Sequence, residues 1–380
     1  MKMAFLTPEY PHPKFGRSGG IGTGIKNLAH ALVEDGHQAV VLVYGQERDA
    51  FFEENGIQFH CIKNVKLKGI SWLLTRKKIQ KLINRLYNDK KIDVVEAPDW
   101  TGITSFIRTR CPIIIRQNGS DTYFCHLDGR KVKFMNRFHE KKALQNADGV
   151  IAVSQFTGDL TNKIFGINLN FTVIPNGIDS HYFDASAKGN SSKDILYFGT
   201  IIRKKGLLEL PLIFNKVIEE IPDAGLIIIG QDAPDMISGN ASTWTMMQDL
   251  FSEKALQNTV YHGPKPYMQI RSYIENAAVC VFPSFAEALP LSWLEAMAMG
   301  KAIVASDIGW ATEMIVDGTD GFLVDPSNHM MYAEKIIAIL QDKKLQHDLG
   351  MNAREKVQKC FDSKVVLQQN ILYYEKFRAE

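Results

Sequence analysis

The sequence predicts an α/β protein made of two doubly wound domains, each with a mainly parallel sheet covered by helices on both faces. Short apolar runs alternate with stretches of helical periodicity along the chain, which is the pattern of repeated βαβ units. At 380 residues the chain is longer than one hydrophobic core usually organises. A polar segment rich in Gly and Ser, at 184–193, separates two such series.

We therefore expect one Rossmann-like domain at 1–183 and a second at 194–360, facing each other across a cleft. The remaining segment, 361–380, is expected to form a helix that packs back on the first domain or stays with the second.

The first elements illustrate the alternation. MKMAFL fits a buried strand, and a long loop rich in Gly and Pro follows it. IKNLAHALVED then has apolar residues at the i, i+3, i+4 and i+7 positions of a helix, which Gly36 ends. QAVVLVYG is the next buried strand, so the first 45 residues are expected to form a βαβ unit.

Later segments repeat this order. Helices are expected near 70–88, 134–146 and 363–377. Further strands are expected at IDVVEAP, CPIIIRQNG, GVIAVS and TVIPNGID, and, after the polar segment, at DILYFG, GLIIIG, TVYHG, AVCVFPS and AIVASD.

Composition narrows the possible partners and the compartment. A net charge of +2 is too small to indicate nucleic acid as a partner. No window of 18 apolar residues predicts a membrane span, and the first apolar run is too short for a signal peptide. The five cysteines are scattered without metal-ligand spacing, which indicates reduced thiols and a cytoplasmic protein.

The segment 283–307, PSFAEALPLSWLEAMAMGKAIVASD, is the most informative for function. A buried strand leads into a loop with Glu287, Pro290 suits the first turn of a helix, and Glu295 falls in its second turn. Ligands of doubly wound sheets bind at the carboxyl ends of strands, where this loop lies, and a carboxylate can accept hydrogen bonds from two sugar hydroxyls. The alternative is that both glutamates simply face solvent.

This segment resembles the E-x7-E motif of retaining nucleotide-sugar glycosyltransferases, family 4 of the group 1 enzymes with the GT-B fold. VIPNGID, ADGVIAVS and VDGTDGFLVDP resemble further blocks of that family, in the same order, and the resemblance is weakest between Phe51 and Thr109. It implies transfer of a hexose or N-acetylhexosamine from a nucleotide-diphosphate sugar, a UDP-sugar rather than a GDP-sugar, to an acceptor hydroxyl. The acceptor would belong to a bacterial surface polysaccharide or a lipid-linked glycan.

The resemblance also implies roles for particular residues. Glu295 would bind the nucleotide ribose and Glu287 the transferred sugar. The backbone N–H groups of Ala288, Leu289 and Leu291 would meet sugar or phosphate.

Bond cleavage leaves negative charge on a diphosphate, which the protein must stabilise. No Asp-x-Asp motif for a metal is present, but YFGTIIRKKG places Arg203, Lys204 and Lys205 after a strand. The family has a basic pair here, so Arg203 and Lys205 are expected to bind the diphosphate without a metal or cofactor, although Thr200 replaces the arginine that often follows the strand glycine. A solvated basic turn is the alternative.

A second source of positive potential is the N-terminal loop. Gly19 and Gly20 precede a helix, so backbone N–H groups and the helix dipole can meet an anion. In the family this loop contacts the donor diphosphate. The spacing is not the G-x-G-x-x-G of dinucleotide-binding proteins.

Asn118 departs from the family pattern, in which His-Gly often follows this strand. An amide cannot accept a proton at neutral pH. This favours a front-face mechanism, in which the departing phosphate takes the acceptor's proton and Asn118 contacts the sugar. Asp99 and Asp121 are candidates on the acceptor side, or are structural.

The stretch from Lys63 to Lys91 contains ten Lys or Arg residues and one acid, Asp89. Such a basic amphipathic helix can lie on an anionic membrane surface, here the inner face of the cell membrane. The alternative is a helix whose apolar side packs on the core.

Two other functions remain open at this stage. One is an enzyme of the same architecture with another reaction, such as an epimerase. The other is a non-catalytic or impaired sugar-nucleotide-binding partner of another glycosyltransferase, which Asn118 would favour and Glu287, Glu295 and Lys205 would not.

Overall fold

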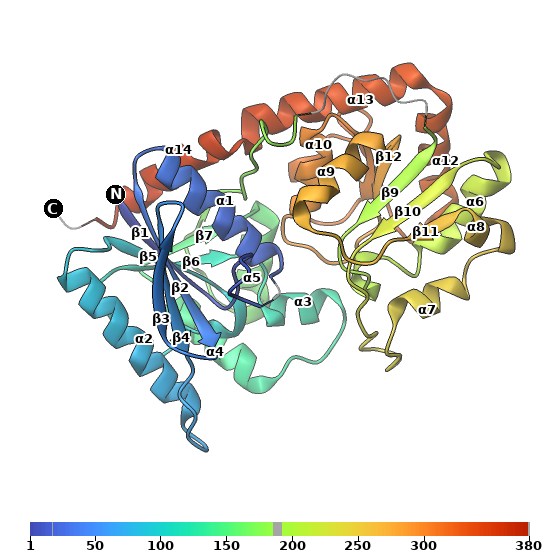
Figure 1. Ribbon diagram of the computed structural model, residues 1–380. Coiled ribbons are helices and arrows are strands. Elements are labelled where there is room, and N and C mark those ends of the chain that lie inside the picture. Colours follow the sequence, from blue (N-terminus) through green and yellow to red (C-terminus); the bar gives the residue numbers. More distant parts are fainter. Residues whose placement is uncertain (17, 185–191, 379–380) are drawn as a thin grey trace. The chain divides into compact units, whose positions relative to one another are not determined.

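The computed structural model describes residues 1–16, 18–184 and 192–378. The chain forms two compact units: unit 1 consists of Met1–Gly177 with Asp362–Glu380, and unit 2 of Ile178–Phe361. Among the described residues, each unit has one sheet flanked by helices (Figure 1).

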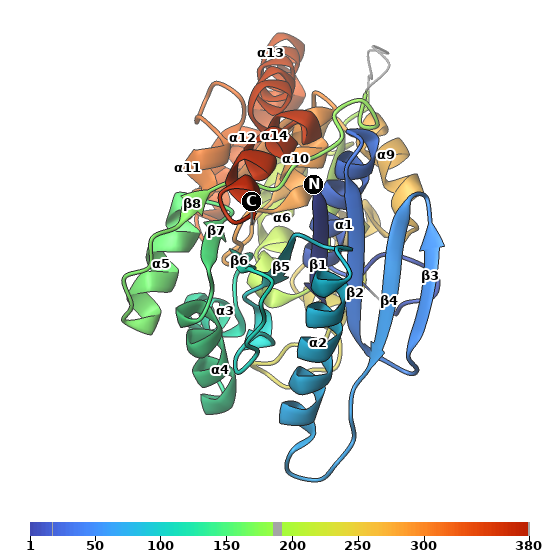
Figure 2. The same cartoon turned by 90° about the vertical axis from the view of Figure 1, so that its left-hand side faces the viewer.

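The sheet of unit 1 has the order β3-β4-β2-β1-β5-β6-β7-β8, which can be followed across Figure 2. All pairs are parallel except the edge pair β3–β4, which is antiparallel. The strands are β1 (Lys2–Thr7), β2 (Gln38–Gln46), β3 (Ala50–Glu54), β4 (Ile57–Lys63), β5 (Val94–Pro98), β6 (Ile113–Gln117), β7 (Gly149–Ala152) and β8 (Thr172–Val173).

Helices cover both faces of this sheet because successive strand residues point to opposite sides. Met3 and Phe5 of β1 belong to the cluster that contains residues of α1 and α14, whereas Ala4 and Leu6 belong to the cluster with α2. The helices are α1 (Gly20–Glu34), α2 (Ser71–Asn88), the 3₁₀ turn η1 (Trp100–Gly102), α3 (Asp121–Leu127), α4 (Phe134–Gln145), α5 (Gln155–Phe165) and α14 (Ser363–Glu375).

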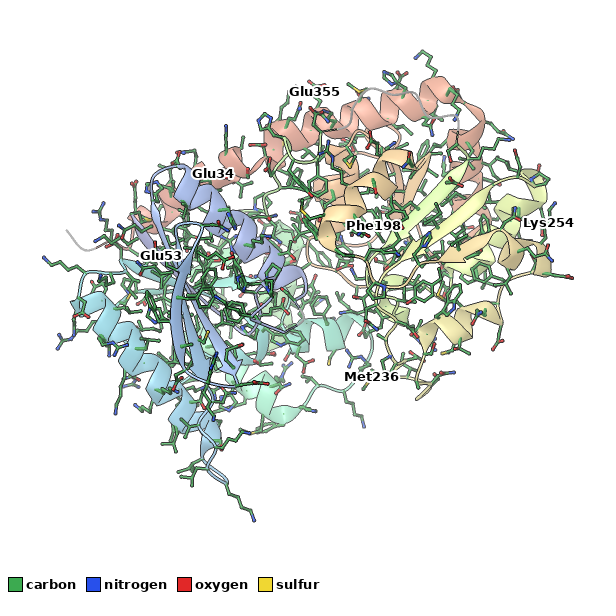
Figure 3. The ribbon with its side chains drawn as sticks, in the orientation of Figure 1. Glu34, Glu53, Phe198, Met236, Lys254 and Glu355 are labelled. Atoms are coloured by element: carbon green, nitrogen blue, oxygen red, sulfur yellow. The ribbon has the colours of Figure 1, made fainter. Side chains whose placement is uncertain are left out.

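The hairpin of β3 and β4 was not expected from the sequence. Asn55 and Gly56 form its turn with φ of 51° and 73°, the conformation that an Asn-Gly hairpin turn requires. Glu53, labelled in Figure 3, and Glu54 are exposed on the edge strand. Charged residues at such an edge disfavour pairing with another chain.

The C-terminal helix α14 packs on unit 1 through a buried polar network. Arg116 forms an ion pair with Glu96 (Nε to Oε1, 2.8 Å), and both side chains are almost fully buried. From α14, Asn370 accepts a hydrogen bond from Arg116, and the Tyr374 hydroxyl donates to Glu96 Oε2 at 2.5 Å. Breaking a buried pair leaves an uncompensated charge, so this network fixes the helix on the sheet.

Unit 2 has a wholly parallel sheet with the order β11-β10-β9-β12-β13-β14. Its strands are β9 (Asp194–Phe198), β10 (Gly225–Ile229), β11 (Thr259–Tyr261), β12 (Val279–Phe282), β13 (Ala302–Ser306) and β14 (Phe322–Val324). Its helices and turns are η2 (Arg203–Lys205), α6 (Leu210–Glu220), α7 (Thr243–Gln248), α8 (Glu253–Gln257), α9 (Tyr267–Asn276), α10 (Leu291–Ala298), α11 (Ala311–Met314), α12 (His329–Gln341), α13 (Lys343–Lys356) and η3 (Val357–Phe361).

The chain leaves unit 1 earlier than the expected boundary at 183. The N–H of Ile178 donates to the carbonyl oxygen of Phe361 at 2.9 Å, and the ring of Phe183 packs edge-on against Tyr267, so these residues belong to unit 2. Of the expected strand TVIPNGID only Thr172–Val173 is a strand. Most of the polar segment at 184–193 lies outside the described residues.

Candidate active site

In unit 2, the loop between β12 and α10 carries Glu287 and lies against the basic turn η2. Two backbone N–H groups of this loop donate to the carbonyl oxygen of Lys204, at 2.8 and 3.2 Å. Gly206 permits the close approach, because its φ is +71° and a Cβ there would lie 1.7 Å from the carbonyl oxygen of Pro283. The two loops therefore form one framework at the carboxyl ends of the neighbouring strands β9 and β12.

Lys205 pairs with Glu287 inside this framework. Its Nζ lies 2.6 Å from Oε1, and the two side chains are 21% and 12% exposed. Lys205 is also close enough to Glu295 to lower the pKa of that carboxyl group, against a larger opposing effect of burial. The Lys205 ammonium group thus interacts electrostatically with both carboxylates of the E-x7-E pair.

Glu295 lies in the second turn of α10 and is 5% exposed. Burial raises its pKa to about 7, while a hydrogen bond from Tyr267 and the charge of Lys205 act in the opposite direction. The Tyr267 hydroxyl donates to Oε1 at 2.8 Å. Near neutral pH this carboxyl group is therefore close to half ionised.

Tyr267, which the sequence analysis did not single out, begins α9 within an aromatic group. Its ring stacks on Tyr182 with 6.5 Å between centroids and an interplanar angle of 8°, and Phe183 meets it edge-on at 6.0 Å. The Tyr182 hydroxyl bonds to Met268 Sδ at 3.2 Å. These contacts hold the Tyr267 hydroxyl on Glu295.

Arg203 forms an ion pair with a different carboxylate, that of Asp235. Its Nε and Nη2 contact the two carboxylate oxygens of Asp235 at 2.9 and 2.7 Å, and Asp235 is 2% exposed. The same carboxylate accepts from the N–H and hydroxyl of Ser238, and the pKa of Asp235 is lowered, chiefly by the Arg203 hydrogen bond. Arg203 therefore holds the loop after β10, whereas Lys205 points to the glutamates.

The residues whose backbone N–H groups were expected to meet sugar or phosphate lie on the same loop and at the start of α10. Ala288 and Leu289 are buried, and Leu291 is the first residue of α10 after the N-cap Pro290. Phe198, labelled in Figure 3, ends β9 immediately before the glycine that leads to the basic turn.

In unit 1, the helix α1 begins as expected beside two glycines, with Gly19 at the N-cap and Gly20 as the first residue. The N–H of Gly22 donates to Oε1 of Glu9 at 2.9 Å. Helix N-termini favour anions because their N–H groups lack partners in the helix. Here the carboxylate of Glu9, a residue that the sequence analysis did not single out, accepts a hydrogen bond from one of these N–H groups.

Asn118 follows β6, and its backbone N–H donates to Oδ1 of Asp99 at 3.1 Å. Asn118 lines a pocket together with Arg116 and Asn176. The pocket has a volume of ≈ 20 Å³, enough for about one water molecule.

Asp99 and Asp121 lie near Asn118 but are turned toward other protein groups. Asp99 is fully buried, and burial, followed by the charge of Glu140, raises its pKa to about 8. Glu140 accepts from the N–H groups of Thr101 and Asp121 at 3.1 and 3.0 Å. The Asp121 carboxylate accepts from Asn136 Nδ2 at 2.8 Å. These carboxyl groups shape the loop that carries Asn118.

Metal-ligating residues do not gather in the part of the chain that the structure describes. No group of three or more His, Cys, Asp or Glu side chains there is placed to hold a metal ion. All five cysteines, which lie in described segments, are unpaired.

Comparison with known proteins gives matches over most of the chain. The family described as Glycosyltransferase Family 4 matches residues 18–182, and that described as Glycosyl transferases group 1 matches residues 180–356. An uncharacterised glycosyltransferase of Methanocaldococcus jannaschii is 24% identical over 382 residues, 98% of each chain. A capsular polysaccharide biosynthesis glycosyltransferase of Staphylococcus aureus is 26% identical over 260 residues, 63% of this chain and 65% of the relative. The crystal structure of Anabaena HepE in complex with UDP superposes with a TM-score of 0.76 at 18% identity, covering 99% of this chain and 100% of that one.

Proposed function

Since the chain belongs to the group 1 glycosyltransferases of the GT-B fold, we propose that it transfers a hexose or N-acetylhexosamine from a UDP-sugar to an acceptor hydroxyl with retention of configuration. The observation that carries this proposal is the convergence of Glu287, Glu295 and Lys205 at the carboxyl ends of β9 and β12. A UDP complex of the similar HepE protein supports uridine as the base.

Each of the three residues has a distinct role in the proposal. The Glu295 carboxylate accepts hydrogen bonds from the ribose hydroxyls, and Glu287 accepts them from the transferred sugar. Lys205 Nζ, already 2.6 Å from Glu287, meets the diphosphate oxygens and stabilises the charge that develops as the bond breaks. We propose that this ammonium group, with the N–H groups at the start of α1, serves in place of a metal or cofactor.

Retention follows from a front-face transfer. The bond between the anomeric carbon and the phosphate oxygen breaks, the acceptor oxygen bonds to the same face, and the acceptor's proton passes to the departing phosphate oxygen. Asn118 is suited to bind a sugar hydroxyl, because its amide donates and accepts hydrogen bonds but does not take a proton. Asp99 acts as a positioning residue, since its buried carboxyl group contacts the Asn118 backbone.

The biological setting is also a proposal. The similarity to a capsular polysaccharide glycosyltransferase of Staphylococcus aureus supports an acceptor in surface polysaccharide or lipid-linked glycan synthesis. We place the reaction on the cytoplasmic side, at the inner face of the cell membrane.

Calorimetry with UDP and GDP, followed by transfer assays with a panel of their sugars, tests the donor. Glu295→Ala should weaken UDP binding about 10- to 100-fold, the effect of leaving buried polar groups without partners. Glu334→Ala, which changes an exposed glutamate of α12 in the same unit, should bind UDP like the parent. Equal affinities of the parent and Glu295→Ala would refute the assignment of Glu295.

An NMR time course of the product tests the mechanism. An α-linked donor should give an α-linked product, and an inverted product would overturn the front-face transfer. Binding of UDP-sugars without transfer to any acceptor would favour the impaired-partner alternative instead.

A further inference from the structure

Unit 1 exposes a cluster of large apolar side chains that does not belong to its core. Phe134 and Met135 of α4 are 77% and 50% exposed, and Trp72 of α2 is 38% exposed. In Figures 1 and 2 the amino-terminal end of α2 and the helix α4 lie at the same end of unit 1. We call this cluster the aromatic surface; it comprises Leu67, Ile70, Trp72, Phe134, Met135 and Phe138.

Ring contacts connect the two helices into one surface. The ring of Phe106 lies 5.6 Å from Trp72 and 6.1 Å from Phe138, measured between centroids. Phe138 in turn stacks on Phe134 at 6.4 Å and 17°. The rings of Trp72, Phe106, Phe138 and Phe134 therefore form one continuous series of contacts.

Phe106, which bridges the two sides, has a φ of +63°. A bulky side chain in this left-handed region is strained, and such strain is found where the surrounding structure has a functional role. The contacts of the Phe106 ring with Trp72 and Phe138 accompany this strained backbone, which persists only where the surrounding structure holds it.

Positive charge borders the aromatic surface on both sides. Lys66 and Lys68 precede α2, Lys131 and Lys133 precede α4, and all four are exposed. None of them is in an ion pair with any residue that the structure describes. The sequence has no acid from 63 to 88 or from 129 to 139.

Beyond its first turn, the helix α2 does not supply an apolar face to a membrane. Its residues Ile79, Ile83 and Leu86 are buried in the core beside β1 and β5. The amphipathic pattern of 63–91 is thus explained by core packing along most of the helix. The available apolar atoms lie at its amino-terminal end and on α4. In the described chain no helix is long and apolar enough to cross a bilayer.

We propose that the aromatic surface docks unit 1 on an anionic lipid bilayer, with its apolar side chains in the headgroup region and the four lysines on lipid phosphates. Aromatic side chains bordered by lysines suit the membrane interface, where apolar and charged groups meet. Uncompensated positive charge favours anionic lipid over a neutral protein partner. This docking proposal rests on the proposed function in one respect: it places the enzyme at the bilayer, where lipid-linked acceptors lie.

Flotation of the full chain with vesicles of phosphatidylcholine, with and without phosphatidylglycerol, tests the proposal. The parent should bind the anionic vesicles, and high salt should weaken binding. Phe134→Ser with Met135→Ser should reduce binding about tenfold or more. Lys131→Glu with Lys133→Glu should reduce it at least as much, because each lysine near the surface contributes about fivefold.

A matched control is available in unit 2. Met236 and Ile237, on the loop after β10, are 73% and 61% exposed and lie outside the lysine cluster (Met236 is labelled in Figure 3). Met236→Ser with Ile237→Ser should bind vesicles like the parent. Thermal unfolding of all variants establishes that each is folded.

Three outcomes would overturn the proposal: equal binding to neutral vesicles, no loss in the Phe134/Met135 variant, or an equal loss in the control. Self-association that disappears with Phe134→Ser would assign the surface to a second copy of the chain instead. UDP binding should be unchanged in every one of these variants. A docking failure with intact UDP binding is thereby distinguished from a failure of the proposed function.

Discussion

The hydroxyl of Tyr267 should set the pH at which the nucleotide binds. Ribose hydroxyls donate to an ionised Glu295, so affinity is present above the pKa of this carboxyl group and lost as the pH falls through it. The group has a pKa of about 7 because burial raises it, and the 2.8 Å bond from Tyr267 limits the increase. Tyr267→Phe removes this donor and leaves the ring in place.

The size of the effect follows from the hydrogen bond. A bond to a charged group contributes about 1.5 kcal/mol or more, and about 1.4 kcal/mol corresponds to one pKa unit. The pKa of Glu295 should thus rise by about one unit, and its ionised fraction at pH 7 should fall from about a half to about a tenth. Affinity should fall about fivefold at pH 7 and be within about twofold of the parent at pH 8.5.

Calorimetry with UDP-glucose from about pH 5.5 to 8.5 measures this, since its diphosphate does not titrate in that range, unlike the terminal phosphate of UDP. Tyr182→Phe is the control, because the Tyr182 hydroxyl contacts Met268 rather than a carboxylate. A loss of the same size at every pH would mean that Tyr267 acts by contact alone. An unchanged or tighter affinity at pH 7 would refute the reasoning altogether.

Three further results are expected. Arg203→Lys and Asp235→Asn should each lower the free energy of unfolding by about 1–3 kcal/mol in urea denaturation, and the double variant should lose little more than either, because both remove one bidentate pair. Asn118→His should keep transfer within about tenfold of the parent, whereas Glu287→Ala should lower kcat/KM about 100-fold, as only the latter removes a transition-state contact; a large gain in Asn118→His would indicate an impaired natural enzyme. Transfer should continue in excess EDTA, and a loss that Mg²⁺ restores would contradict the role given to Lys205.

The apolar runs of the sequence predicted the interior strands of both sheets except β4, because these strands are largely buried on both faces. The β3–β4 hairpin was missed for the opposite reason: β3 is half exposed, and its charged residues interrupt any apolar run. The Asn55-Gly56 dipeptide between two Phe-containing runs was the available signal.

The site shows a similar division. Glu287 and Glu295 lie on one loop and on the helix that follows it, so their spacing can be read from the local sequence. The partners Tyr267 and Asp235 reach Glu295 and Arg203 through the packing of separate elements, and no local pattern records such contacts. Arg203 illustrates the consequence: the sequence places it beside Lys205, but only the fold shows that a buried aspartate holds its guanidinium group.

In the basic stretch 63–91, the positive charge and the apolar periodicity have different explanations. A helix with a basic side and an apolar stripe has the same pattern whether the stripe meets a core or a lipid surface. Burial decides between them: Ile79 and Ile83 are fully buried, whereas Phe134 is 77% exposed on a helix outside that stretch. The sequence identified part of the positive charge, in 63–91. The structure identifies the exposed apolar side chains, which lie on α4 and at the amino-terminal end of α2. Electrostatic attraction acts over about a Debye length, so the lysines that precede α2 and α4 can draw unit 1 to the same lipid surface.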